Sequence, residues 1–357
     1  LTENVGSRGA AMKLARAWRD AHPEIADGHR MYQTTALRLG RSAEVVEEYT
    51  RWYAASEKTP EQASLFARVL LPKEARVVVD EALARHPDAP DLLLRKGLIA
   101  TFEGDHAEAD ALFTKAQGSA DYRYFVERHA RALVALGRGS EAARRVAEVL
   151  EKTNELPLAT TYAQIAQLPG VTPPAPTWTY VDRLAAEQGG AWRASWARSV
   201  LGETAGASKP VAIKDTDVAI AQVHFRAAES PAEAWTACSK APPRSLADID
   251  ATVAILLAAE VARAGDLELA EKLLAARREL SSPWRLLVDY VTTGAEAPER
   301  GRLDPQYRAA LDFVRARALQ AAGQPAEVML AAAARGDVMK SVVTRAMAAW
   351  AKPTPPG

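Results

Sequence analysis

The chain has 357 residues, of which 48% are hydrophobic and 25% are charged, a composition typical of ordinary globular proteins. Its 45 Lys and Arg residues balance its 45 Asp and Glu residues, which argues against broad binding to nucleic acids or acidic membranes. The single cysteine, Cys238, excludes an internal disulfide and a cysteine-based metal site. No apolar run reaches the roughly 18 residues that a membrane span needs.

Apolar residues recur at helical spacing along most of the chain, and Ala is abundant, which favours helix. Val and Ile do not gather into alternating strand patterns, so we predict an all-α protein. The first helix should turn Ala11, Leu14, Ala15 and Trp18 inward. In chain order, the predicted helices are 8–21, 26–39, 43–54, 60–70, 73–85, 90–102, 106–116, 120–136, 140–152, 157–167, 178–188, 190–201, 215–228, 231–239, 246–264, 267–279, 284–292, 305–322, 325–334 and 338–350.

A short phrase recurs at joints between these helices. Gly, any three residues, Glu and then Ala or Val occurs from Gly40, Gly104, Gly137 and Gly323, and a copy with Leu in place of Glu begins at Gly265. Apolar-periodic segments lie before and after each copy, which indicates a helix hairpin whose Gly ends the first helix in the left-handed conformation. One hairpin cannot bury its apolar face alone, so neighbouring hairpins should stack into a continuous core.

The stretch Gly104–Phe113 is the clearest copy of this phrase. Asp105 is expected to cap the second helix of its hairpin, and Ser140 should do the same in the next hairpin. The small Ala109 lets two helices approach closely, and Phe113 fills the gap one turn later. Fillers at the corresponding places in other hairpins are Val79, Val146 and Leu274.

This pattern resembles the tetratricopeptide repeat family. The residues that carry the resemblance are Gly97, Gly104, Ala109, Phe113 and Ala116, with Pro23 and Pro87 matching the closing proline of the repeat. The family's aromatic positions in the first helix are mostly Leu or Ala here, and a related helical-hairpin repeat stays open. The resemblance covers roughly residues 8–155 and 248–335. It implies a right-handed α-solenoid of antiparallel helix hairpins.

The repeat pattern divides the chain into four parts. Residues 1–168 and 215–350 read as repeats, the second set closed by a capping helix, and 351–357 as a disordered tail. Between the sets, 169–214 is an irregular junction that begins with PGVTPPAP, whose prolines cannot continue a helix. Trp178, Trp192 and Trp196 crowd into this junction, where they either pack the irregular joint or line an aromatic ligand pocket.

No catalytic signature is present: the chain lacks a Gly-rich phosphate loop, His-Glu-x-x-His and Gly-x-Ser-x-Gly. His106 and Asp110 share a helix face but Glu108 lies opposite, so they fit a helix surface better than a metal site. Cys238 would need His224 as a base to act as a nucleophile, and it falls where the repeat needs a small core residue. We therefore expect no enzyme activity, cofactor or metal.

A binding surface is the remaining candidate. In tetratricopeptide proteins the first helices of the hairpins line a concave groove, and arginines recur at the positions that the resemblance places there. Guanidinium groups can hold carboxylates bidentately, although the solvated face of any helix in this Arg-rich chain would also show several. The groove positions are Arg30, Thr34, Arg38, Ser64, Arg68, Asp91, Leu94, Phe102, Tyr124, Glu127, Arg131, Arg263, Phe313, Arg317 and Gln320.

The leading hypothesis is a non-enzymatic scaffold that binds a protein or peptide, with an acidic peptide fitting the arginines. A second is a regulatory repeat module of a larger kinase, protease or transcription regulator. The chain begins at Leu1, on what reads as the second helix of a hairpin, which motivates this alternative. A third is an enzyme with a site near the Trp-rich junction. Cytoplasm is favoured, and a periplasmic or lipid-anchored form fits if an N-terminal segment is removed; the oligomeric state stays open.

Overall fold

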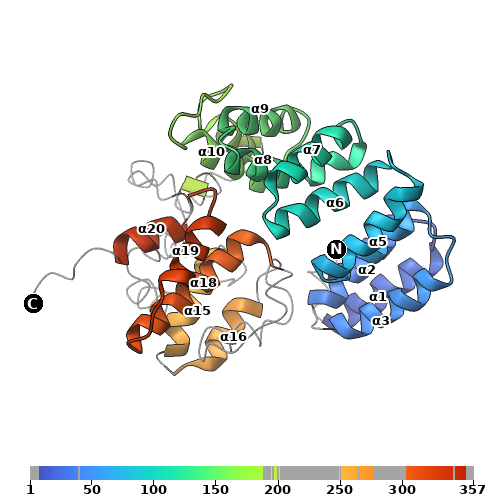
Figure 1. The fold of residues 1–357 in the computed structure, drawn as a ribbon, viewed down its shortest axis with the longest axis horizontal. Helices are drawn as coiled ribbons and strands as arrows, with labels where there is room; N and C mark the ends of the chain where they lie inside the picture. Colours follow the sequence, from blue (N-terminus) through green and yellow to red (C-terminus); the bar gives the residue numbers. More distant parts are fainter. Residues whose placement is uncertain are drawn as a thin grey trace, which may run out of the picture. The chain divides into compact units, whose positions relative to one another are not determined.

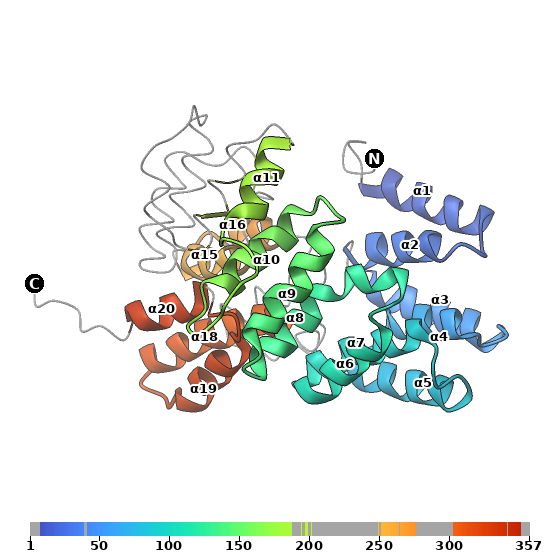
Figure 2. The same ribbon diagram turned by 90° about the horizontal axis from the view of Figure 1, so that it is seen from above.

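The computed structural model describes residues 8–38, 41–187, 194, 197–198, 201, 249, 251–263, 265–275, 303–340 and 342–350. These residues form sixteen α-helices and a short 3-10 helix, with no strand among them, which confirms the prediction of an all-α protein (Figures 1 and 2). None of the described helices is long and apolar enough to cross a membrane. The described residues divide into two compact units, the first ending at Phe125 and the second beginning at Val126.

In the first unit each helix packs against the next one in the chain, and α2 also touches α4, which in turn touches α6. Helices α2, α4 and α6 therefore form one layer. Its core has two parts, one around Tyr32, Tyr49 and Phe66 and one around Val79 and Leu92. The elements are α1 Arg8–Ala21, α2 Ala26–Arg38, α3 Ser42–Ala54, α4 Pro60–Ala67, α5 Pro72–Arg85, α6 Pro90–Glu103, α7 His106–Ala116 and η2 Ala120–Tyr124.

The joint between α6 and α7 forms as the sequence predicts. Gly104 ends α6 with φ +83°, in the left-handed region that favours glycine. The Asp105 carboxylate then accepts a hydrogen bond of 2.9 Å from the Glu108 amide and so caps α7. Phe113 is fully buried against Gly97, where an added Cβ would lie 2.8 Å from the ring. The predicted fillers Val79, Val146 and Leu274 are fully buried as well.

In the second unit α8 packs on α9, α9 on α10 and α10 on α11, while α15, α18 and α20 pack on one another. The Gln164 side chain links α10 to the loop before α20 by donating to the Met339 carbonyl at 3.1 Å. The elements are α8 Val126–Ala135, α9 Gly139–Leu150, α10 Leu156–Ala166, α11 Thr179–Glu187, α15 Ala251–Arg263, α16 Leu267–Ala275, α18 Pro305–Ala321, α19 Glu327–Gly336 and α20 Val342–Trp350.

The proline-rich segment after α10 is not helical, as predicted, and Tyr162 holds it. The Tyr162 hydroxyl donates to the Ala175 carbonyl at 2.6 Å and accepts from the Ala175 amide at 2.9 Å. The buried Tyr162 hydroxyl thus satisfies both the amide and the carbonyl of Ala175, which have no helical hydrogen bonds. The predicted boundaries at 168, 214 and 350 stay predictions.

Five local predictions are wrong. Leu14 is 54% exposed, whereas Met12 turns into the core together with Ala15, which was predicted to do so. Helix α20 begins at Val342 rather than at residue 338, because 338–339 form a turn. The predicted helix 120–136 breaks at Phe125 into η2 and α8, because the 3-10 turn at 120–124 does not continue as an α-helix. Helix α4 ends at Ala67 rather than at residue 70. Ser140 does not cap α9, which begins at Gly139; its hydroxyl instead accepts from the Thr172 amide at 2.8 Å.

Candidate binding face of the first unit

Three side chains connect α2 to its neighbours, two of them to α4 and one to η2. From α2, the Gln33 amide donates to the Leu65 carbonyl of α4 at 2.8 Å. Arg68, directly after α4, donates to the Thr34 hydroxyl at 2.8 Å. Arg30 of α2 donates to the Asp121 carboxylate of η2 at 2.8 Å. We call the surface formed by Arg30, Thr34, Glu61, Arg68, Asp91, Arg95 and Asp121 the binding face.

Each of the three helices brings an acid and then an arginine to this face. Asp27 precedes Arg30 by three residues, Glu61 precedes Arg68 by seven, and Asp91 precedes Arg95 by four. Residues three, four or seven apart share one side of a helix. The acids therefore lie toward the N-terminal end of the layer and the arginines one or two turns further along.

Arg30 is well compensated. Its guanidinium lies 2.8 Å from the Asp121 carboxylate and 3.2 Å from that of Asp27. Burial opposes the charge, but these two carboxylates outweigh it and hold the pKa of Arg30 above its ordinary value. Arg30 thus serves to join α2 to η2.

Arg68 and Arg95 are not compensated in this way. Among the described residues, neither guanidinium forms an ion pair with a carboxylate, and the Nε of each is buried without a hydrogen-bond partner. Burial lowers the pKa of Arg68, and the charge of Arg30 lowers it further. Arg95 is only 7% exposed; burial, with the charges of Arg68 and Arg30, lowers its pKa to about 9. An arginine side chain keeps its charge at neutral pH even where it is buried.

The acids at the other end of the face are also poorly compensated. Burial raises the pKa of Asp91, and the neighbouring Asp121 raises it further despite Arg30. Burial likewise raises the pKa of Glu61, with Asp91 as the next contributor. The binding face therefore has a negative end at Glu61 and Asp91 and a positive end at Arg68 and Arg95, and Asp91 and Arg95 offset each other's charge only in part.

The structure brings together four of the predicted groove residues, Arg30, Thr34, Arg68 and Asp91. Of their predicted neighbours, Ser64 and Leu94 are buried in the layer, and Phe102, like Asp91, is half-buried. Tyr124 is 58% exposed and its hydroxyl accepts from Arg123 at 2.6 Å. The side chains of Arg38 and Arg263 lie outside the described residues.

The predicted groove residues of the second unit are engaged in ion pairs. Arg131 lies 2.5 Å from the Glu127 carboxylate and 2.7 Å from the Asp304 carboxylate, and Arg128 also pairs with Asp304. Asp304 is buried and caps α18 by accepting from the Gln306 amide. This cluster ties α8 to the start of α18. Arg317 lies 3.6 Å from Glu260 and over the Phe313 ring, and Gln320 is exposed.

Sequence reasoning missed Arg95, Glu61 and Asp121. Arg95 lies inside the apolar run LLLRKGLIA, which reads as core. Its spacing of four from Asp91 on a predicted helix was the available signal. Asp121 gave no signal, because its contact with Arg30 spans 91 residues.

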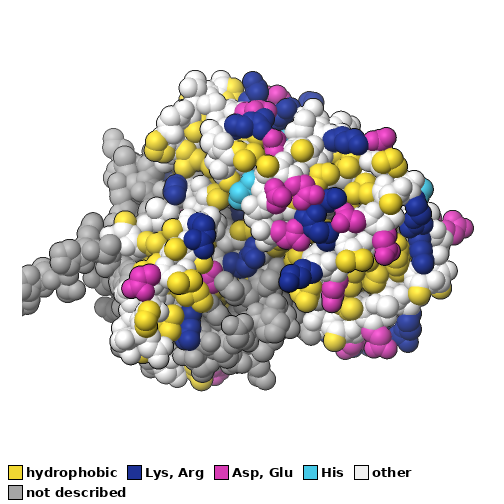
Figure 3. Space-filling model, viewed as in Figure 1, with side chains coloured by type: hydrophobic (Ala, Val, Ile, Leu, Met, Phe, Trp, Pro, Cys, Tyr) yellow, Lys and Arg dark blue, Asp and Glu magenta, His cyan; other side chains and the backbone are white. Residues whose placement is uncertain are grey.

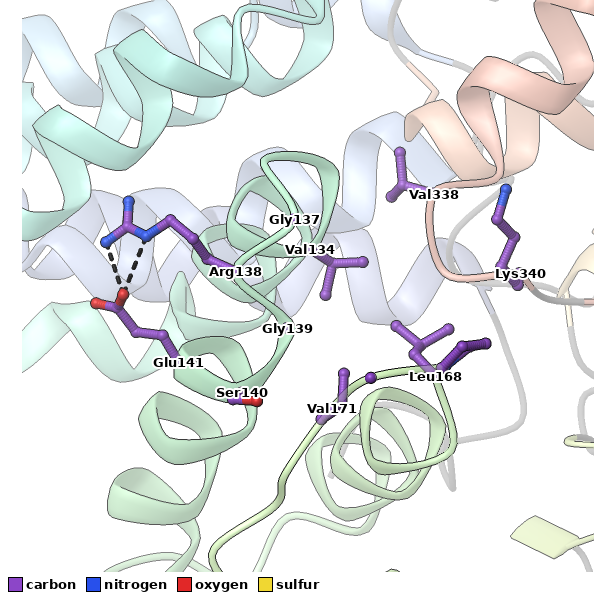
Figure 4. A pocket seen from close by; sticks show the side chains of 12 residues that line it. Val134, Gly137, Arg138, Gly139, Ser140, Glu141, Leu168, Val171, Val338 and Lys340 are labelled. Atoms are coloured by element: carbon purple, nitrogen blue, oxygen red, sulfur yellow. Dashed lines mark hydrogen bonds and ion pairs between the residues drawn. The ribbon is translucent and has the colours of Figure 1, made fainter.

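The second unit has a concavity between the α8–α9 turn, the segment after α10 and the loop before α20 (Figure 4). Its volume is about 380 Å³. Arg138 turns toward Glu141, while Val134, Leu168 and Val338 supply an apolar side (Figure 4). The lining residues are Val134, Gly137, Arg138, Gly139, Ser140, Glu141, Leu168, Pro169, Gly170, Val171, Val338 and Lys340.

The other residues singled out in the sequence do not gather into a reactive site in the part of the chain that the structure describes. Glu108 pairs with Arg76 at 2.8 Å and with Lys96 at 3.6 Å. His106 is half-buried, which lowers its pKa. No group of three potential metal ligands occurs among the described residues. Trp178 lies under the Arg198 guanidinium at 4.7 Å. Trp192, Trp196, Cys238 and His224 lie outside the described residues.

Basic and acidic side chains are interspersed over the described surface in Figure 3, without a broad patch of one sign. Charges are therefore compensated locally, and the binding face stands out because the half-buried Arg68 and the buried Arg95 form no ion pair with a described carboxylate. In comparisons with known proteins, no family model and no curated protein matches the chain.

Proposed function

We propose that the protein is a non-enzymatic scaffold or adaptor that binds a segment of a protein partner along the face of α2, α4 and α6. The observation that carries this proposal is the pair of the half-buried Arg68 and the buried Arg95, neither of which forms an ion pair with a carboxylate among the described residues. A charge withdrawn from water costs free energy unless an opposite charge meets it. An acidic group of a partner would meet it.

We further propose that the helices are tetratricopeptide-like hairpins stacked as an α-solenoid. The support is a recurring joint: Gly104, Gly137, Gly265 and Gly323 all have positive φ, and each separates two helices that pack on each other. The pairs are α6 with α7, α8 with α9, α15 with α16 and α18 with α19. Such stacks bind partners along the surface formed by successive helices.

The proposal is tested by affinity capture from native lysate followed by quantitative mass spectrometry. We expect Arg68→Gln combined with Arg95→Met to lose the proteins that the unaltered chain captures, on the order of tenfold or more, because a charge-assisted contact is removed. The matched control is Arg51→Gln on α3, whose side chain is 75% exposed and 3.8 Å from Glu47. Capture of the same proteins by the double variant would contradict the proposal.

A further inference from the structure

The binding face carries a more specific charge requirement than a row of arginines would. Three arginines, Arg30, Arg68 and Arg95, share it with acids from the same helices and from η2. Arg30 is neutralised by Asp27 and Asp121. Among the described residues, the charges of this face that form no ion pair are Arg68 and Arg95 at one end, and Glu61 and Asp91 at the other.

We infer that Arg68 and Arg95 together bind one isolated carboxylate of the partner, and that Glu61 and Asp91 bind a basic side chain next to that carboxylate. This inference rests on the proposed scaffold function and specifies the chemistry of its partner. Arg68 is half-buried and Asp91 is half-buried, so a ligand reaches both ends from the surface, while Arg95 lies beneath.

The arginine end suits a carboxylate because the planar guanidinium donates two parallel hydrogen bonds to its two oxygens. The Nε atoms of Arg68 and Arg95 are buried and lack hydrogen-bond partners, so a carboxylate at the surface would meet the charge of the two guanidinium groups rather than Nε itself. A second negative charge close by would meet Glu61 and Asp91, whose own charges already repel each other and that of Asp121. A continuous acidic stretch is therefore disfavoured, which narrows the earlier expectation of an acidic peptide.

The distance between the two ends sets the spacing in the ligand. Asp91 and Arg95 are one turn apart on α6, a rise of about 6 Å. In an extended peptide, side chains two residues apart point to the same side and lie about 7 Å apart. A Lys or Arg two residues from an Asp or Glu would therefore reach both ends at once.

The test uses short synthetic peptides of Ala and Ser, acetylated and amidated so that their ends carry no charge. One peptide carries a single Glu. Two carry Glu and Lys two residues apart, in either order, and a fourth carries Glu at every second position. Each is titrated into the full chain by calorimetry at constant ionic strength, beside inorganic phosphate, which separates a carboxylate site from a general anion site.

We expect the better of the two Glu–Lys peptides to bind on the order of tenfold more tightly than the single-Glu peptide. The peptide with several Glu residues should bind no more tightly than the single-Glu peptide. The same holds for inorganic phosphate. Arg95→Met and Arg68→Gln should each weaken binding of the Glu–Lys peptide by roughly tenfold or more, while Arg51→Gln leaves it unchanged. Thermal melting of each variant verifies that it is folded.

Tighter binding of the multiply acidic peptide or of phosphate would overturn the two-signed site while leaving a scaffold that binds acidic partners. Unchanged binding by folded Arg95→Met would overturn the assignment of the arginines. Absence of binding by every peptide would overturn the inference, and the capture experiment with the double variant would then decide the proposed function independently.

Discussion

Two buried charges of this protein show two different solutions to the cost of removing a charge from water. Asp304 is surrounded: it pairs with Arg128 and Arg131 and accepts from the Gln306 amide. Arg95 has no such partner among the described residues. A buried charge that is paired stabilises its surroundings when its partners are present, whereas an unpaired one is retained at a cost. A ligand that brings an opposite charge to the unpaired group would offset this free-energy cost.

Replacing these two residues should therefore have opposite consequences. We expect Arg95→Met to leave the free energy of unfolding unchanged or to raise it by up to roughly 2 kcal/mol, because an apolar side chain of similar length removes an unpaired charge. Asp304→Ala should lower it by about 3 kcal/mol, because Arg128 and Arg131 lose their carboxylate and α18 loses its cap. Urea denaturation measures both. Similar destabilisation by the two variants would show that Arg95 has a stabilising partner.

His29 makes stability depend on pH. It is 3% exposed, with Nδ1 2.8 Å from the Tyr49 hydroxyl and Nε2 3.0 Å from the Pro23 carbonyl. Burial lowers its pKa below 6.5 in spite of the Pro23 carbonyl. Below that pH the unfolded chain binds a proton that folded His29 does not. The stability contributed by neutral His29 is thus complete above the unfolded pKa and is lost as pH falls toward the folded one.

The melting temperature should accordingly decrease as the pH is lowered from about 7.5 to about 5.5, the range in which His titrates. In His29→Gln, which can still donate to the Pro23 carbonyl, the fall should be smaller. His106, whose pKa burial also lowers, accounts for part of the remainder. An identical pH profile in the two proteins would show that His29 does not contribute.

At the scale of elements, the joint of α6 and α7 needs glycine at two places for different reasons. Gly97 lies against the Phe113 ring, and Gly104 has φ +83°. We expect Gly97→Ala to cost roughly 1–3 kcal/mol through overpacking and Gly104→Ala about 1 kcal/mol through backbone strain. Gly118→Ala, with open space and no positive φ, is the matched control and should be neutral. Thermal melting distinguishes the three, and an equal response would contradict this account.

The boundaries of most elements were predictable because their signals are local. Prolines stand in the first turn of α4, α5 and α6, and Thr59 forms a capping box with Gln62. The failures arise where a distant segment competes. The Ser140 hydroxyl accepts a hydrogen bond from the Thr172 amide of the proline-rich segment instead of capping α9. Leu14 has an apolar side chain at helical spacing, yet the core takes Met12 and Ala15 from α1 and leaves Leu14 exposed.

At the scale of the whole molecule, the chain has equal numbers of basic and acidic residues, but its arginines are not equally paired with carboxylates. In the first unit Arg68 and Arg95 remain without a carboxylate among the described residues, whereas Arg131 and Arg317 of the second unit have Asp304 and Glu260 nearby. In the capture experiment we therefore expect Arg317→Gln to behave as Arg51→Gln does. The predicted groove was assigned to both halves of the chain; the charge pattern favours the first.

The all-α class, the glycine joints and the sharing of one helix side by Asp91 and Arg95 all follow from spacing along the chain, because helical periodicity and turn chemistry act over a few residues. Whether each arginine is paired with a carboxylate does not follow from that spacing. Arg30 is neutralised by a carboxylate 91 residues away, while the hydrogen bond that Arg68 donates within the described part of the chain goes to the hydroxyl of Thr34. Which charge is matched depends on what packing brings beside it, and burial, which makes the mismatch costly, exists only in the folded protein.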